Sequence, residues 1–401
     1  MASGAVNRQA FAFDEEIAAL GAEPIPAAPY YDPEYYQLEA AAIFRRSWLQ
    51  IGHVCELSEP GSFIVRPVEV GKTSILVTRG PDGVIRAFHN VCTHRGSKLV
   101  QEASGKRSAF SCPYHMWNFG YDGQLRAAPD FESFYADKSK CGLKAVAVDV
   151  CAGLIFINLD RSPSESLRDY LGPLADRIET FAVARATGFT EYVYDIDANW
   201  KLIMDNFQEN YHLRYVHART GGGMPPDNPF GYPAGFGFMG AHRTQTMRGG
   251  GGLNPGPVQG IGMRKIMEFA AADGLIGGPY SMDYCVFFPN LFVFGSGMSP
   301  FSLYVMPIAP DRSRGVFRFY WIGDDDSASR RFAREFLAMM MRDLHAEDLT
   351  SIVNSQVGLA SGALDHIHFQ AQEVLCRHLF RSVNDRVEAY KAERRSSRGA
   401  V

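Results

Sequence analysis

The chain has 401 residues, and at roughly 150 residues per domain this length corresponds to two or three domains. Its 40 basic and 44 acidic side chains leave a net charge of −4, and 46% hydrophobic with 21% charged residues is ordinary for a globular protein. These values argue against a disordered or collagen-like chain and against a broad nucleic-acid-binding surface.

Cysteine usage and the first residues suggest a cellular location. The 7 cysteines are an odd number spread over a long chain, unlike a secreted disulfide framework. The start, MASGAVNRQAFAFDEEIAAL, has acids where a secretory signal needs an apolar core, and no later stretch has the ~18 apolar residues of a membrane span. We therefore expect a cytoplasmic protein with no membrane and no nucleic-acid partner.

The first part of the chain is expected to be helical from about residue 11 to residue 50. After Pro33, which favours a first helical turn, Tyr36, Ala40, Ile43 and Trp48 recur at near-helical spacing. We expect residues 1–45 to form an N-terminal helical segment that packs on the last domain.

From about residue 52 the pattern changes to short β-branched stretches separated by turn signals. SFIVRPVEV, TSILVTRG and GLIFINLD alternate with turns such as Gly-Pro-Asp-Gly at 80–83. A Ser/Pro segment at 161–165 ends this pattern. We therefore expect a small all-β domain at residues 46–165.

Two pairs of metal-ligand residues lie in this all-β domain. Cys92 and His94 form C-x-H, and Cys112 and His115 form C-x2-H, both where hairpin loops are expected. Two thiolates and two imidazoles suit a tetrahedral structural zinc. They also suit a two-iron, two-sulfur cluster with cysteines on one iron and histidines on the other. The residues themselves leave both alternatives open.

The remaining residues, 166–401, mix helices and strands. LRDYLGPLADRIETF is amphipathic, NWKLIMDNFQENYHLRYVH is long and helical, and residues 284–307 are strand-like. Helical blocks are expected at 329–359 and near 370–395. Residues 221–262 are rich in glycine and proline, which is typical of a functional loop or lid, or of disorder.

Glu209, His212 and His217 form E-x2-H-x4-H in the long helical stretch. Glu209 and His212 would share one helix face, but five residues rotate His217 by roughly 140° from His212. If both imidazoles bind one ion, the helix must unwind or bulge near residues 214–216. A histidine pair alone is more often structural. We interpret His212 and His217 as ligands because the chain also contains the cysteine-histidine pairs at 92–94 and 112–115.

A carboxylate is expected as the third ligand, because two imidazoles and one carboxylate form the metal site of non-haem Fe(II) oxygenases. A lone buried carboxylate is costly, and a metal would compensate for the cost. We select Asp348, with Glu347 and Asp365 as rivals; the alternative is that Asp348 lies at the solvent edge. It interrupts an apolar series that recurs every four residues: Phe332, Phe336, Met340, Leu344, Asp348 and Ile352.

Two other patterns are set aside. Residues 235–240 match G-x-G-x-x-G, but no apolar helix follows, so we reject a dinucleotide site. The letters DHIH at 365–368 suit ligands, but a structural role is favoured. The spacing C-x4-C-x2-C of a plant-type ferredoxin does not occur in the sequence.

The two cysteine-histidine segments, CTHRG and CPYHMWNFGYDGQL, resemble the cluster-binding motifs of Rieske proteins, whose usual pattern is C-P-Y-H-G-W. The resemblance implies that Cys92 and Cys112 bind one iron of a [2Fe-2S] cluster, and His94 and His115 the other. Met116 stands where the family usually has glycine, which affects only the packing of the loop. With NWK at 199–201 and AEDLTSIVNSQVGL at 346–359 in the expected order, the whole chain resembles the catalytic (alpha) subunit of Rieske non-haem iron oxygenases.

This resemblance implies an α+β fold, with an inserted all-β Rieske domain at 46–165 and a helix-grip catalytic domain, an antiparallel sheet on helices, at 166–401. His212, His217 and Asp348 would bind mononuclear Fe(II). Glu209 would bridge the iron site of one subunit to the cluster of its neighbour. Asp205, one helical turn earlier, would assist in relaying electrons and protons.

The implied function is that of a terminal oxygenase component. It would use O2 to hydroxylate, or oxidatively N- or O-dealkylate, a small aromatic substrate, as a mono- or dioxygenase of aromatic compound catabolism. Electrons would come from a separate NAD(P)H-dependent reductase, directly or through a ferredoxin. Glutamate at 209, where many aromatic-ring dioxygenases have aspartate, resembles the homotrimeric branch that includes quaternary-ammonium oxygenases and demethylases.

Three alternatives remain open at this point. One is a quaternary-ammonium monooxygenase of the same family. The second is an electron-transfer Rieske protein without oxygenase activity, and the third is a zinc-stabilised binding protein of helix-grip type. An apolar wall would suit an aromatic substrate, and aromatic rings with an acid could also enclose a quaternary ammonium. Candidates for that wall are Leu202, Met204, Phe207, Phe287, Phe292 and Phe294.

Overall fold

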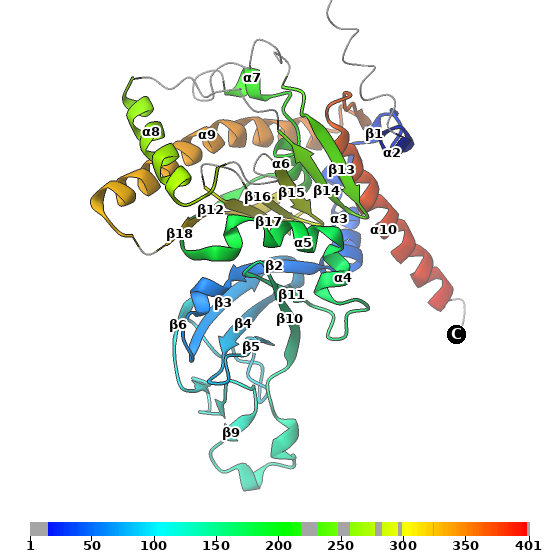
Figure 1. Cartoon of the computed structure of the whole chain (residues 1–401). Coiled ribbons are helices and arrows are strands. Elements are labelled where there is room, and N and C mark those ends of the chain that lie inside the picture. The colour runs from blue at the N-terminus through cyan, green and yellow to red at the C-terminus, as the bar shows by residue number, and fades with distance from the viewer. Residues whose placement is uncertain are drawn as a thin grey trace, which may run out of the picture. The chain divides into compact units, whose positions relative to one another are not determined.

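The structure, a computed structural model, describes residues 15–217, 231–247, 257–276, 283–295, 299–323 and 325–398. The chain divides into two compact units (Figure 1). Residues 44–170 form one unit, and the described residues before 44 and after 170 form the other. The sequence had suggested 46–165 for the inserted domain.

The unit of residues 44–170 is built on a seven-stranded antiparallel sheet in the order β2-β11-β10-β5-β4-β3-β6. A three-stranded sheet, β7-β8-β9, is formed by the residues between β6 and β10. All six residues of β2 are buried. The strands are β2 Trp48–His53, β3 Ser62–Val68, β4 Thr73–Arg79, β5 Ile85–His89, β6 Ser104–Lys106, β7 Phe110–Ser111, β8 Asn118–Phe119, β9 Leu125–Ala127, β10 Ala145–Cys151 and β11 Leu154–Asn158.

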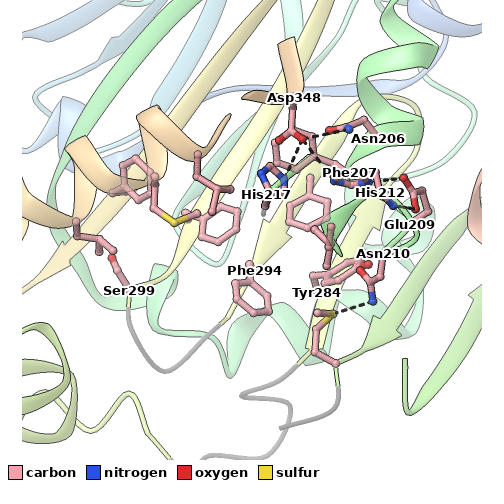
Figure 2. A pocket seen from close by; sticks show the side chains of 18 residues that line it. Asn206, Phe207, Glu209, Asn210, His212, His217, Tyr284, Phe294, Ser299 and Asp348 are labelled. Carbon is pink, nitrogen blue, oxygen red and sulfur yellow. Dashed lines mark hydrogen bonds and ion pairs between the residues drawn. The ribbon is translucent and has the colours of Figure 1, made fainter. Parts of the chain in front are cut away.

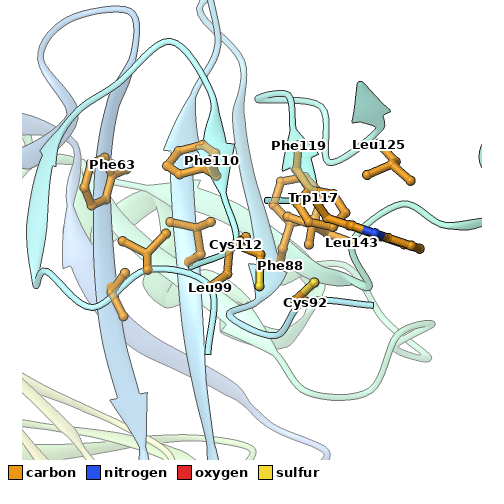
Figure 3. Packing of buried hydrophobic residues seen from close by; sticks show 13 residues of the cluster. Phe63, Phe88, Cys92, Leu99, Phe110, Cys112, Trp117, Phe119, Leu125 and Leu143 are labelled. Carbon is orange, nitrogen blue, oxygen red and sulfur yellow. The ribbon is translucent and has the colours of Figure 1, made fainter. Parts of the chain in front are cut away.

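An aromatic core holds this unit together (Figure 3). The rings of Phe63 and Phe110 meet edge to face, with centroids 5.5 Å apart, and both are buried. Cys92 and Cys112 belong to the same buried cluster. Burial of these apolar side chains therefore anchors the two loops that carry the cysteine-histidine pairs.

The second unit contains a seven-stranded antiparallel sheet in the order β12-β18-β17-β16-β15-β14-β13. Aromatic side chains alternate along its strands, as in Phe317 and Phe319 of one strand, so that they share one face. The strands are β12 Ala186–Ile196, β13 Gly235–Met239, β14 His242–Thr246, β15 Asp283–Phe287, β16 Leu291–Phe294, β17 Phe301–Ala309 and β18 Arg312–Ile322.

Helices cover this sheet (Figure 1). The longest, α9, contacts α6, α7, α8 and strand β12, and Ser327 caps its N-terminus by accepting a hydrogen bond from the backbone of Arg330. The helices of this unit are α2 Glu15–Ala19, α3 Pro33–Glu39, α5 Pro173–Glu179, α6 Trp200–Asn206, α7 Leu213–Val216, α8 Pro257–Ala272, α9 Ala328–Ala360 and α10 Val374–Arg398. The short helix α4, Leu167–Leu171, lies at the end of the other unit. None of the helices among the described residues is long and apolar enough to cross a membrane.

The expected helical character of residues 11–50 is confirmed in part: α2, α3 and two short helical turns are observed, but two strands also lie in this range. Asp32 and Pro33 do start a helix, α3, and a π-helical turn extends it to Phe44, but strand β2 begins at Trp48. Strand β1, Ile25–Pro26, precedes α3 and pairs with β19, His366–Ile367. The near-helical spacing of apolar residues continues into β2 because that strand is buried along its whole length.

The expected irregular segment at 221–262 is also wrong where the structure describes it. Residues 235–246 form the hairpin β13–β14, and α8 begins at Pro257. Residues 231–234 and 247 are irregular, as expected, and residues 221–230 and 248–256 lie outside the described residues. The G-x-G-x-x-G letters at 235–240 fall in β13 and the hairpin turn, which agrees with the rejection of a dinucleotide site.

Candidate metal centres and substrate pocket

Two loops of the same geometry present the cysteine and histidine pairs. The backbone N–H of Cys92 and of Cys112 each donates to the carbonyl five residues later, at 2.8 Å. The N–H of Gly96 and of Met116 each donates back to the carbonyl of that cysteine, at 3.0 Å. This repeated turn brings His94 and His115 together, with ring centroids 4.5 Å apart.

The ligand-type atoms of these loops are buried and unsatisfied. In the part of the chain that the structure describes, the Nδ1 atoms of His94 and His115 have no hydrogen-bond partner, and Cys92 and Cys112 are buried and form no disulfide. Burial raises the pKa of the Cys92 thiol to about 11, although the N–H of His94 donates to its sulfur. Unpaired buried nitrogens are unfavourable, so this set of donors fits a bound metal group that would displace the thiol protons.

The spacing of the four residues bears on the choice between zinc and an iron-sulfur cluster. Ligands of one tetrahedral zinc lie within about 4 Å of one another. Cys92, His94, Cys112 and His115 do not form such a compact group. Among the described residues, only the group described next has three ligand atoms that all lie within 4.8 Å of one another. The looser arrangement around Cys92 and Cys112 suits a two-metal cluster.

The second centre is formed by His212, His217 and Asp348, whose ligand-type atoms all lie within 4.8 Å of one another (Figure 2). Asp348 Oδ1 is 3.0 Å from His217 Nε2 and 3.4 Å from His212 Nε2. Asp348 is buried, so the alternative that placed it at the solvent edge is wrong. Two imidazoles and one carboxylate converging in this way fit a mononuclear metal.

The two histidines lie at the ends of the one-turn helix α7. The expected long helix is wrong: α6 ends at Asn206, and turns separate it from α7. The expected bulge near 214–216 is therefore also wrong, because the chain leaves the helix before His212. His217 closes α7 in a non-helical conformation, which lets its ring approach that of His212, at a centroid distance of 5.3 Å.

Outer carboxylates orient both imidazoles. Glu209 Oε1 contacts His212 Nδ1, and Glu347 Oε2 is 3.0 Å from His217 Nδ1. Each Nε2 is thereby directed toward Asp348, as is usual for metal-bound histidines. Glu347, a rival for the third ligand, thus contacts His217 on the side away from Asp348, where an orienting carboxylate belongs.

These contacts set the charges of the centre. Burial alone would raise the pKa of Asp348, but the hydrogen bond with His217 and the nearby imidazoles of His345 and His212 hold this pKa well below its ordinary value. Burial would lower the pKa of His217, but Asp348 and Glu347 raise it. A carboxylate that stays ionised in a buried site is ready to bind a cation.

Two candidate residues lie elsewhere. Asp205 accepts a hydrogen bond from the Tyr30 hydroxyl at 2.7 Å and does not line the pocket. Because α6 ends at Asn206, the expectation that Asp205 shares a helix face with Glu209 is wrong. Asp365 is exposed before β19 and is not part of the metal-binding group.

A cavity of about 230 Å³ opens onto the His212, His217 and Asp348 centre (Figure 2). Glu209 and Asp348 are its acidic residues, and the described lining contains no arginine or lysine. Among the described residues, the buried Tyr284 hydroxyl has no hydrogen-bond partner there. Six aromatic side chains make up much of the wall: Phe207, Tyr284, Phe292, Phe294, Phe301 and Phe319.

Some pocket residues were expected and others were missed. Phe207, Phe292 and Phe294 line the cavity, whereas Leu202, Met204 and Phe287 do not. On α9 the lining residues follow spacings of four, three and four, as a helical face should, instead of a strict four. They are Leu337, Met341, Leu344 and Asp348. That spacing was visible in the sequence and would have found Leu337 and Met341.

Comparison with known protein families agrees with this architecture. A domain described as "Rieske [2Fe-2S] domain" matches residues 47–146. A domain described as "Ring hydroxylating alpha subunit (catalytic domain)" matches residues 183–389, more than half of the chain. Together the two domains define the class of Rieske non-haem iron oxygenase components.

Individual relatives belong to the same class. The chain is 36% identical over 197 residues to the glycine betaine monooxygenase oxygenase subunit of Chromohalobacter salexigens, covering 49% of this chain and 44% of that protein. It is 36% identical over 197 residues to the carnitine monooxygenase oxygenase subunit of Acinetobacter baumannii, covering 48% and 52%. The chain therefore spans about half the length of these relatives.

Solved structures share the fold. A quaternary ammonium Rieske monooxygenase in complex with an inhibitor matches with a TM-score of 0.75 at 22% identity, over 92% of this chain and 97% of that one. A naphthalene 1,2-dioxygenase with indole bound matches with a TM-score of 0.71 at 23% identity, over 89% and 90%.

The chain belongs to the ring hydroxylating alpha subunits, the catalytic components of Rieske non-haem iron oxygenases. The expected family, its α+β fold and its two cofactors, a [2Fe-2S] cluster and a mononuclear iron, are confirmed.

Proposed function

We propose that the chain is the terminal oxygenase of a multicomponent system and that it oxidises a small quaternary ammonium compound. The observation that carries this proposal is the cavity in which six aromatic rings and the carboxylate of Glu209 surround the His212, His217 and Asp348 centre. This substrate class was an alternative in the sequence interpretation. It replaces the aromatic substrate as the main hypothesis because the relatives are named for glycine betaine and carnitine.

The chemistry divides between the cofactors and the side chains. When bound, the cluster and the mononuclear iron would supply electron transfer and O2 activation. Cys92, His94, Cys112 and His115 would hold the cluster, and His212, His217 and Asp348 the iron. In the net reaction a C–H bond beside the nitrogen receives one oxygen atom of O2, and the other leaves as water with two electrons and two protons.

The pocket wall explains the preference for a cation. A quaternary ammonium has no N–H to donate, so it needs π faces and nearby negative charge instead of hydrogen-bond acceptors. The rings of Phe292, Phe294 and Tyr284 provide the first, and Glu209 the second, because Asp348 would be bound to the iron. Because no arginine or lysine lines the described wall, no basic side chain opposes a cation there.

A single-turnover experiment tests the proposal without the unidentified reductase. The holoprotein, with its cluster reduced by dithionite, is mixed with 18O2 and one compound at a time: glycine betaine, carnitine, choline, indole or naphthalene. We expect oxidation of a trimethylammonium compound, seen as the dealkylated amine together with the aldehyde formed from the oxidised carbon, which is formaldehyde when an N-methyl group reacts. His212→Ala, with an intact cluster spectrum, should give no product.

A different set of products would change the assignment. Oxygenated indole or naphthalene, with no product from a trimethylammonium compound, would favour an aromatic substrate. The apolar rings of the same cavity could also contact such a substrate. Reduction and reoxidation of the cluster without any product, in protein that holds no mononuclear iron, would favour an electron-transfer protein and overturn the proposal.

We further propose a homotrimer that receives electrons from a separate NAD(P)H-dependent reductase, directly or through a ferredoxin. The resemblance to the family supports Glu209 as the bridge to the cluster of the next subunit, and its contact with His212 Nδ1 is consistent with that role. Asp205, which contacts Tyr30 instead, is retained only as a candidate for proton relay. A cytoplasmic location stays a prediction.

A further inference from the structure

A buried histidine next to the proposed iron site has no hydrogen-bond partner among the described residues. His345 lies on α9, three residues before Asp348, and its side chain is 2% exposed. Neither Nδ1 nor Nε2 of its ring makes a hydrogen bond within the structure. Burying an imidazole with both nitrogens unpaired is unfavourable, and a hydrophobic side chain of similar size would avoid the cost.

Aromatic neighbours hold the ring of His345 in one orientation. Its centroid is 4.8 Å from that of Tyr194, 5.0 Å from Phe207 and 5.8 Å from Phe317. Tyr194 belongs to β12, Phe317 to β18, and Phe207 follows α6, so three parts of the domain enclose the ring. A side chain fixed on all sides is suited to position another group.

The polar group that this ring faces is the carboxylate of Asp348. Oδ1 of Asp348 is the oxygen near His217 and His212, at 3.0 and 3.4 Å from their Nε2 atoms. The other oxygen, Oδ2, is 3.7 Å from His345 Nδ1. The two oxygens therefore have different surroundings, one among the metal-ligand nitrogens and one beside His345.

We propose that His345 is a positioning residue for the mononuclear iron: its Nδ1–H donates to Asp348 Oδ2 and leaves Oδ1 as the metal ligand. The 3.7 Å separation closes to a hydrogen bond when the carboxylate is drawn to an ion, because such contacts tighten in the loaded site. With one oxygen held by His345, Asp348 binds through one atom, which keeps positions on the pocket side open for substrate and O2.

The inference rests on the proposed function, because it assumes that Asp348 is an iron ligand. Two substitutions separate positioning from packing. His345→Phe keeps an aromatic ring against Tyr194 and Phe207 but removes the donor. His345→Asn keeps a donor near the position of Nδ1 but removes the ring. Tyr194→Phe, which removes the adjacent buried hydroxyl, is the matched control.

The measurements are the Fe(II) dissociation constant of the mononuclear site and the electron paramagnetic resonance spectrum of its nitric oxide complex, in protein with an intact cluster. We expect His345→Phe to weaken Fe(II) binding about 10- to 100-fold and to alter the spectrum. His345→Asn and Tyr194→Phe should stay within about threefold of the original protein. The melting temperature of iron-free His345→Phe should not fall, because an unpaired imidazole is replaced.

Each contrary outcome has a distinct meaning. If His345→Phe binds Fe(II) as tightly as the original protein while His345→Asn loses stability, His345 is a packing residue and the inference is overturned. If both variants bind Fe(II) normally, it is overturned as well. If the original protein itself holds no mononuclear iron, the proposed function fails first, which the same titration reveals.

Discussion

One residue of the cluster-binding loops, Met116, has a strained backbone conformation. Met116 has a positive φ of 57°, in the left-handed region that side chains with a Cβ avoid. Its counterpart in the other cluster loop is Gly96, with φ 76° and the same backbone hydrogen bond to the cysteine carbonyl. The departure from the family pattern at Met116 therefore affects backbone strain, and not only the packing of the loop.

Replacing this methionine by glycine should stabilise the domain. We expect Met116→Gly to raise the free energy of unfolding by about 1 kcal/mol, because glycine adopts φ 57° without the steric cost of a Cβ. Gly96→Ala should have the opposite effect of similar size, since its Cβ would meet no atom and only the backbone conformation opposes it. Urea unfolding followed by near-UV circular dichroism measures both. A loss of stability in Met116→Gly would contradict the argument.

Asp205 should make stability depend on pH. Burial raises its pKa to about 7, against the opposing hydrogen bond from Tyr30. Between the ordinary value of about 3.9 and about 7 the folded protein holds a proton that the unfolded chain has lost. The contribution of Asp205 therefore falls as pH rises through this range, by up to about 1.4 kcal/mol per unit.

The isosteric variant Asp205→Asn removes this titration. We expect the unfolding free energy of the variant, relative to that of the original protein, to increase from pH 5 to pH 7. Above pH 7 the difference between the two proteins should stay constant. Urea unfolding at pH 5, 6, 7 and 8 measures the difference. Asp197→Asn, at an exposed position, is the control and should show a constant difference. If the difference between Asp205→Asn and the original protein were constant from pH 5 to pH 8, burial would not raise the pKa of Asp205.

At the scale of elements, one buried ion pair joins the N-terminal helix α3 to α6. Lys201 Nζ lies 2.6 Å from Glu39 Oε1, and both side chains are fully buried. Trp200 Nε1–H donates to the other oxygen of Glu39, at 3.0 Å. The pair thus ties residues early in the chain to the helix that leads into the proposed iron site.

Removing one charge of the Lys201–Glu39 ion pair should destabilise the protein. We expect Glu39→Gln to lower the free energy of unfolding by about 3 to 5 kcal/mol, because Lys201 is left buried without its counter-charge. The double variant Glu39→Gln with Lys201→Met should recover a large part of that loss. Guanidinium unfolding measures both. Glu388→Gln, which breaks the exposed pair with Lys391, serves as control and should change nothing measurable. Equal losses in Glu39→Gln and the control would refute the assignment.

The elements also show where pattern reasoning succeeds. The helix expected at 329–359 is observed at Ala328–Ala360, because a long amphipathic period is a strong local signal. The single helix expected around His212 is instead two short helices, α6 and α7. In the segment between them, Gln208 is buried and accepts a hydrogen bond from Arg243, which is distant in sequence.

At the scale of the whole molecule, the two centres should be separable by substitution. His212→Ala should lose the mononuclear iron and keep the visible spectrum of the [2Fe-2S] cluster. Cys92→Ser should lose the cluster spectrum, because one thiolate ligand is gone. Iron analysis with absorption and electron paramagnetic resonance spectroscopy checks both variants. Loss of the cluster spectrum in His212→Ala, or a colourless original protein that contains only zinc, would contradict the two-centre assignment.

The sequence by itself determined the family, the α+β class, the cysteine-histidine loops, and His212, His217 and Asp348 as the residues to examine. These follow from residue types at short, specific spacings, which local chemistry constrains. The tertiary structure alone decided that Glu347 orients His217, that Asp205 pairs with Tyr30, and that His345 faces Asp348. Such contacts join residues on separate elements, so they arise only when those elements pack together and bury the charges between them.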